Sequence, residues 1–170
     1  LDTHLVLAGD FDFAAPHANG VLVGAGNITK TLLGSETQGN QVTGLDGPVL
    51  KAVVIGKETT LLLTAGGLYA IKGTKADLSP IDTAIEKTII DIVDATVDDD
   101  MAAWLATQDE IYLWRDGKLT NVEIAGVTLA DPLLAYGAYF QGKPALWLVS
   151  NGQLVALQAN GAAIDAWVVV

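Results

Sequence analysis

Apolar and polar positions along the chain form short runs that recur at a nearly constant interval. The segment AWLATQDEIYLW, residues 103–114, reads as two short apolar strands joined by a polar turn. Similar segments lie 43 residues away on either side, LLLTAGGLYAI around Thr64 and LWLVSNGQLVAL around Ser150. A weaker copy, VLVGAGNITKTL, surrounds Gly24. An interval of 40–43 residues with about four short strands per repeat is typical of β-propeller blades.

The four copies agree when Gly24, Thr64, Thr107 and Ser150 are aligned. Large or branched residues then lie three positions earlier, and apolar residues lie four positions later: Val21, Leu61, Trp104 and Trp147 before, Ile28, Leu68, Ile111 and Leu154 after. We therefore predict an all-β chain, a β-propeller of four four-stranded blades in one domain over residues 1–170. The predicted repeats are residues 1–46, 47–87, 88–126 and 127–170. Four such blades either close a small ring or form an arc that another chain completes.

Two stretches of the pattern need a decision. In the first copy the apolar run Thr3 to Ala8 predicts the first strand, and a loop follows through Pro16 and His17. Residues 79–93 have helical spacing after Ser79-Pro80, but the β-branched residues from Thr88 to Val93 and the repeat both favour strands there. Asp116-Gly117 and Asn151-Gly152 predict tight hairpin turns.

Composition narrows the possible partners. Half of the 170 residues are hydrophobic (51%), 17% are charged, and the net charge is −11. Such a surface repels nucleic acid and anionic membranes, and no apolar run approaches the roughly 18–20 residues that span a bilayer. The absence of cysteine excludes disulfides, thiolate metal sites and cysteine nucleophiles. The chain begins with Leu1, which indicates a processed chain or an excised segment.

Several loops carry residues of a known repeat. Gly9-Asp10-Phe11-Asp12 precedes an apolar strand in the first copy, acidic residues 94–100 precede Ala103-Trp104-Leu105 in the third, and Gly137 to Leu146 has the same outline without carboxylates. These repeats resemble the integrin-type FG-GAP and VCBS propeller repeats, whose blades join their first two strands through a calcium-binding loop. The resemblance implies the propeller fold and a possible calcium site, but no copy has the full set of aspartates.

Only the third copy retains enough carboxylates for a metal. Asp94, Asp98 and Asp100 fall at alternate loop positions, and calcium prefers six to eight oxygen ligands, commonly including several carboxylates. The alternatives are a solvated acidic turn and a weak calcium site. We expect no other cofactor.

No catalytic constellation is present in the sequence. The two histidines, His4 and His17, have no nucleophile motif beside them, and no pair of carboxylates has an assignable catalytic spacing. We therefore expect a non-enzymatic scaffold that binds other protein chains or copies of itself, in an extracellular or surface-exposed assembly. The alternative is a carbohydrate-binding propeller that uses Trp114, Trp167 or tyrosines such as Tyr139. A propeller hydrolase or lyase with clustered carboxylates and His17 is the third hypothesis.

Overall fold

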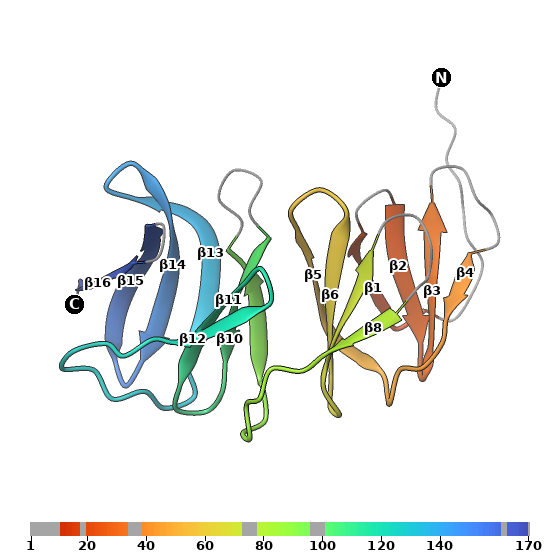
Figure 1. The fold of residues 1–170 in the computed structure, drawn as a ribbon, viewed down its shortest axis with the longest axis horizontal. Helices are drawn as coiled ribbons and strands as arrows, with labels where there is room; N and C mark the ends of the chain where they lie inside the picture. The colour runs from red at the N-terminus through yellow and green to blue at the C-terminus, as the bar shows by residue number, and fades with distance from the viewer. Residues whose placement is uncertain are drawn as a thin grey trace. The chain divides into compact units, whose positions relative to one another are not determined.

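The computed structural model describes residues 11–17, 20–33, 39–72, 78–95, 101–160 and 163–169. These residues form sixteen strands in four antiparallel four-stranded sheets, with no helix among them (Figure 1). Each sheet lies inside one predicted repeat, so the all-β class and the four four-stranded repeats are confirmed. No helix in the described part of the chain is long and apolar enough to cross a membrane.

The chain divides into two compact units, Leu1–Asp82 and Thr83–Val170, and each unit holds two sheets. In every sheet the strands are neighbours in the order in which they follow one another in the sequence. The first sheet contains β1 (Phe13–His17), β2 (Gly20–Ala25), β3 (Ile28–Leu33) and β4 (Asn40–Val42). The second contains β5 (Val49–Ile55), β6 (Thr59–Thr64), β7 (Leu68–Lys72) and β8 (Leu78–Ile81).

The second unit repeats this arrangement. The third sheet contains β9 (Asp91–Asp94), β10 (Ala102–Ala106), β11 (Ile111–Arg115) and β12 (Lys118–Asn121). The fourth contains β13 (Leu133–Phe140), β14 (Lys143–Ser150), β15 (Gln153–Asn160) and β16 (Ala163–Val168).

Two of the tight turns have the backbone that their sequences predict. Asp116 and Gly117 have φ of 49° and 76°, and Asn151 and Gly152 have φ of 50° and 72°. Two successive positive φ values are typical of the two-residue turn that matches the twist of an antiparallel hairpin. Asp, Asn and Gly tolerate this conformation, so these dipeptides are reliable markers of the hairpins.

Two expectations are corrected by the structure. The predicted loop through Pro16 and His17 is wrong, because Phe13–His17 form β1, which pairs with β2. β1 is an edge strand, the position in which a sheet tolerates proline, and its short alanine-rich sequence gives little strand signal. The strand predicted from Thr3 to Ala8 lies outside the described residues.

Residues 79–93 are not helical. β8 ends at Ile81, residues 82–90 have no regular structure, and β9 begins at Asp91. The helical alternative is therefore wrong, and the preference for strands is confirmed only at the two ends of the stretch, with the first strand of the third repeat starting three residues later than Thr88.

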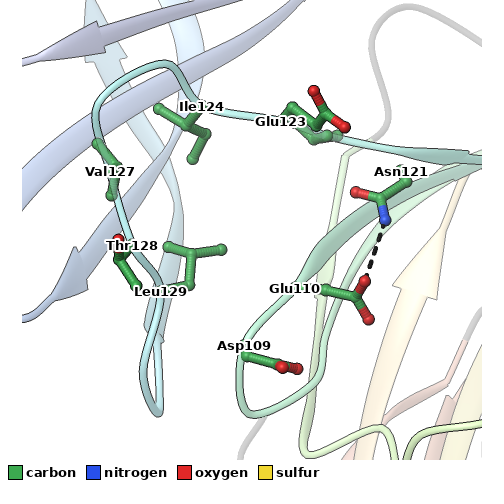
Figure 2. Close-up of a pocket in the computed structure, with 9 residues that line it drawn as sticks. Asp109, Glu110, Asn121, Glu123, Ile124, Val127, Thr128 and Leu129 are labelled. Atoms are coloured by element: carbon green, nitrogen blue, oxygen red, sulfur yellow. Dashed lines mark hydrogen bonds between the residues drawn. The ribbon is translucent and has the colours of Figure 1, made fainter.

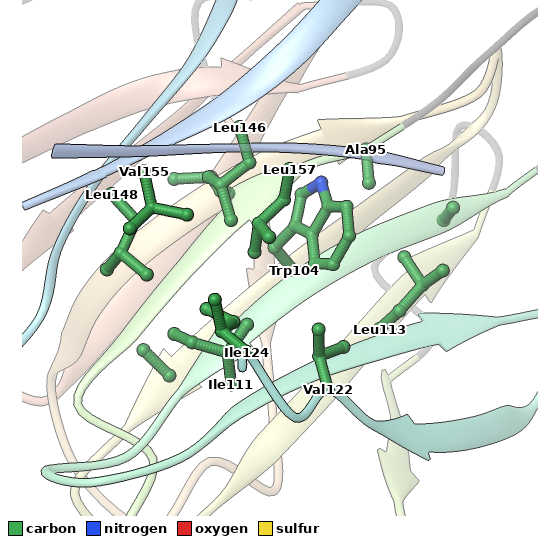
Figure 3. Packing of buried hydrophobic residues seen from close by; sticks show 13 residues of the cluster. Ala95, Trp104, Ile111, Leu113, Val122, Ile124, Leu146, Leu148, Val155 and Leu157 are labelled. Atoms are coloured by element: carbon green, nitrogen blue, oxygen red, sulfur yellow. The ribbon is translucent and has the colours of Figure 1, made fainter. Parts of the chain in front are cut away.

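The two sheets of the second unit share one hydrophobic core. Trp104, Ile111 and Leu113 of the third sheet pack against side chains of the fourth sheet, as Figure 3 shows: Leu146, Leu148, Val155 and Leu157. Trp104 is 1% exposed, so its predicted role in packing between blades is confirmed at the level of two neighbouring sheets. In each sheet, we call the side that bears Trp104, or the residue at the equivalent position of the repeat, the forward face. The opposite side is the rear face.

In the first unit, too, the forward face of the first sheet packs on the rear face of the second. Leu22 and Val42 of the first sheet pack against Leu62 and Ile71 of the second. His17 adds a polar contact between the same two sheets, since its Nδ1 lies 2.7 Å from the hydroxyl of Thr60. In both units, therefore, the forward face of one sheet packs on the rear face of the next sheet along the chain.

The strand register corrects the alignment of the first copy by one residue. Ser150 pairs with Gln153 across a two-residue turn, and Ala25 pairs with Ile28 in the same way. Ala25 rather than Gly24 is thus the equivalent of Ser150, and Leu22 rather than Val21 takes the Trp104 position. Because side chains alternate between faces, this shift moves Leu22 into the core and places Val21 on the rear face.

Candidate functional site

In the second, third and fourth sheets the tip of the central hairpin is built around a buried hydroxyl group, whereas the first sheet has Ala25 at this position. Thr64, Thr107 and Ser150 are all buried. The hydroxyl of Thr107 accepts a hydrogen bond from the amide of Glu110 at 3.1 Å, and the amide of Thr107 donates to the carbonyl of Glu110 at 3.0 Å. Threonine at this position therefore closes the turn locally and presents the side chains of Asp109 and Glu110 outward.

The segment that leads into each sheet is fastened to the same tip. The hydroxyl of Thr64 donates to Asp46 at 2.7 Å, and this bond holds the pKa of the Asp46 carboxyl below its usual range. In the fourth sheet, the hydroxyl of Ser150 accepts from the amide of Ala130 at 2.7 Å and donates to the carbonyl of Ala130 at 2.9 Å. The third sheet uses charge for the same purpose.

Lys87 forms the charged version of this contact. Its Nζ lies 2.8 Å from one oxygen of Asp109 and 2.9 Å from the other, and 2.9 Å from Oε2 of Glu110. Glu110 also accepts hydrogen bonds from the hydroxyl of Tyr112 at 2.9 Å and from the amide of Asn121 at 3.4 Å. One ammonium group thus bridges two carboxylates at the rim of the second unit.

An open groove lies beside this cluster. It has a volume of about 400 Å³, and Figure 2 shows Asp109 and Glu110 on one side of it and the connection from β12 to β13 on the other. The rest of the lining mixes apolar and polar side chains: Val122, Ile124, Val127 and Leu129 with Asn121, Glu123 and Thr128. The connection is held by the amide of Asp131, which donates to the carbonyl of Gln108 at 2.7 Å.

The two carboxylates at the groove, Asp109 and Glu110, are stabilised in their charged form. Hydrogen bonds from Lys87 lower the pKa of both Asp109 and Glu110, and the same bonds raise the pKa of Lys87. A general acid at neutral pH needs a carboxyl group whose pKa is raised. Both carboxylates are therefore ionised at neutral pH and poorly suited to donate a proton to a substrate.

The predicted calcium residues are only partly visible. Asp94 is half-buried in β9, whereas Asp98 and Asp100 lie outside the described residues. Within residues that the structure describes, no three His, Cys, Asp or Glu side chains form a metal-binding group. In the fourth copy the segment with the outline of the calcium loop is mainly strand, since β13 continues to Phe140 with a bulge near Gly137. The calcium site stays a prediction.

The candidate ligand-binding residues His17, Trp114 and Tyr139 differ in their exposure to solvent. His17 is buried between two sheets, so it is not placed in an open loop where it could meet a ligand. Trp114 is buried as well and offers no free ring face for stacking on a sugar. Tyr139 is 69% exposed and keeps an accessible ring.

The forward face of the fourth sheet is the second candidate site. Phe140 lies edge-on to Trp147, with ring centroids 5.5 Å apart and planes at 88°, and its centroid is 5.2 Å from that of Trp167. Leu133 and Val149 pair across β13 and β14 on this face and are 71% and 44% exposed. The face is thus an apolar surface with an aromatic centre.

Sequence reasoning found Trp147 but missed the surface around it. The signal was the repeat itself, since Trp147 takes the position that Trp104 occupies in the packed interface.

A similarity search of the chain finds no matching protein-family model and no matching curated protein.

Proposed function

We propose that this chain is a β-propeller-type scaffold that binds another protein chain through the forward face of its fourth sheet. The observation that carries the proposal is the apolar forward face around Trp147, with Leu133 71% exposed beside it. Contiguous exposed apolar surface is uncommon on soluble proteins and often marks a protein-binding site. The equivalent forward faces of the first and third sheets are both packed against a neighbouring sheet.

Enzymatic alternatives have weaker support. The carboxylates at the groove are held ionised by Lys87, and His17 is buried against Thr60. These features disfavour acid–base hydrolysis at either place. Carbohydrate binding depends on Tyr139 and the half-buried Trp167, because Trp114 is buried.

A photo-crosslinking experiment tests the scaffold. A benzophenone amino acid is introduced at Leu133 in the full chain, and a matched variant carries it at Lys118, which is exposed in the third sheet. After irradiation in the cells that produce the protein, we expect discrete protein adducts from position 133 that position 118 does not give. Absence of adducts from position 133, or the same adducts from both positions, would refute the proposal.

A further inference from the structure

The open face on the fourth sheet has a counterpart on the first sheet. The rear face of the first sheet carries Val21 and Ile28, which are 42% and 50% exposed. Val21 pairs with Leu32, and Ala25 pairs with Ile28, so these four side chains lie on one side of the sheet. Val23 also lies on this face but is only 7% exposed, so the open apolar part of the rear face is the surface around Val21 and Ile28.

The corresponding faces elsewhere are buried. On the rear face of the third sheet, Ile92 and Leu105 pair across β9 and β10 and are both fully buried. On the forward face of the second sheet, Leu61 is also fully buried. Among the described residues, the fourth sheet thus has exposed apolar side chains on its forward face and the first sheet has them on its rear face.

Resting on the proposed scaffold function, we propose that the partner is a second copy of this chain. The forward face of the fourth sheet packs on the rear face of the first sheet of that copy. The same kind of contact is found inside both units, where the forward face of one sheet packs on the rear face of the next: Trp104 on Leu148 in the second unit, and Leu22 on Leu62 in the first.

Two further observations bear on a contact between copies. Each chain has a net charge of −11, which opposes association of like chains, so a contact between them needs faces with few charged residues. Lys30 on the rear face of the first sheet and Lys143 and Asp165 on the forward face of the fourth are the charged strand residues on these two surfaces. The two faces also differ from each other, so the contact is head-to-tail and leads to a closed ring or an open row of copies.

The test uses one variant on each face. Leu133→Lys places a charge on the forward face of the fourth sheet, and Ile28→Lys places one on the rear face of the first. Both positions are at least half exposed, so the folded chain tolerates them, and circular dichroism confirms this. Leu50→Lys is the matched control, because Leu50 is a 60% exposed apolar residue of the second sheet.

Light scattering across micromolar concentrations gives the mass of each sample. We expect the wild-type chain and Leu50→Lys to exceed the single-chain mass of 17.7 kDa, and each face variant to remain at that mass. An equal mixture of the two face variants should form a one-to-one dimer, since one intact forward face and one intact rear face remain. This rescue is specific to a head-to-tail contact.

Three results would overturn the inference. They are a wild-type chain that stays single at every concentration, an Ile28→Lys variant that associates like the wild type, and folded variants that do not pair when mixed. A single wild-type chain that still gives adducts to a different protein from position 133 would overturn the self-contact alone. The absence of adducts at that position would overturn the scaffold function as well.

Discussion

Replacing Trp104 with alanine should severely destabilise the second unit. The indole is 1% exposed and lies among Leu146, Leu148 and Leu157. Truncation of a large buried aromatic side chain costs about 3–5 kcal/mol, because transfer free energy is lost and a cavity remains. Since small domains are stable by about 5–15 kcal/mol in total, this loss is a large share of the folding free energy.

Two comparison variants separate packing from other causes. The Nε1 of Trp104 is buried and finds no hydrogen-bond acceptor among the described residues, so Trp104→Phe removes volume without breaking a hydrogen bond. We expect Trp104→Phe to cost about 1–2 kcal/mol. Trp147→Ala changes the same repeat position on the open face and should cost less than half as much as Trp104→Ala in a single chain.

Urea unfolding followed by circular dichroism gives the three free-energy differences, provided that the dependence on urea is unchanged. Hydrogen exchange then locates the loss: amides of β14 and β15 should lose protection, whereas amides around Leu22 in the first unit should not. A cost of less than about 1 kcal/mol for Trp104→Ala, or an equal cost for Trp147→Ala, would show that Trp104 does not hold the two sheets together.

Three further predictions concern the first sheet and the hairpin of the third. A Cβ at Gly24 would lie 3.3 Å from the ring of Phe13, so Gly24→Val should overpack the first unit by about 1–3 kcal/mol, measured as a lower urea midpoint. Thr107→Val leaves the amide of Glu110 without its hydroxyl acceptor and should cost about 1–2 kcal/mol, while Thr107→Ser should restore most of the stability. Lys87 lowers the pKa of Glu110, so its ion pair with Glu110 stabilises the folded chain above the unfolded-state carboxyl pKa, and this stabilisation is lost as pH falls through the folded-state pKa. Lys87→Met should therefore raise the pKa of Glu110 in a carboxyl NMR titration. An unchanged pKa would show that Lys87 is not the cause.

Periodicity predicted the repeats because each sheet is built from local hairpins. The sequence features that indicated the hairpins are short. They are two-residue turns such as Asn151-Gly152, and strands in which apolar residues are continuous or alternate with polar ones. The first copy gave the weakest signal, since β1 is an alanine- and proline-containing edge strand and Gly24 is one residue away from the structural equivalent of Ser150. A shift of one residue cannot be seen in an alignment of apolar letters, yet it reverses the face of every side chain in a strand.

The groove and the ion pair beside it were not predicted because their residues come from separate stretches of the chain. Lys87 precedes β9 and meets Asp109 across 22 residues, whereas Val127 to Leu129 belong to the connection into the next sheet. Turn patterns place Asp109 and Glu110 at a hairpin tip but do not show which cation reaches them. The ion pair is solvent-exposed and contributes little stability, so no strong compositional signal accompanies it.

The same repeat position has two different surroundings in this chain, and that difference carries the functional argument. Trp104 is buried against the fourth sheet, whereas Trp147 lies on a face where Leu133 is largely exposed. Stacked repeats commonly end in a polar outer face that keeps the terminal unit soluble. Here the forward face of the fourth sheet has an exposed Leu133 where the packed forward face of the third has Asp91, and the rear face of the first has an exposed Ile28 where the packed rear face of the fourth has Gln153. Polar residues at both positions would make these two faces more soluble, so their apolar character supports the contact between copies that we propose.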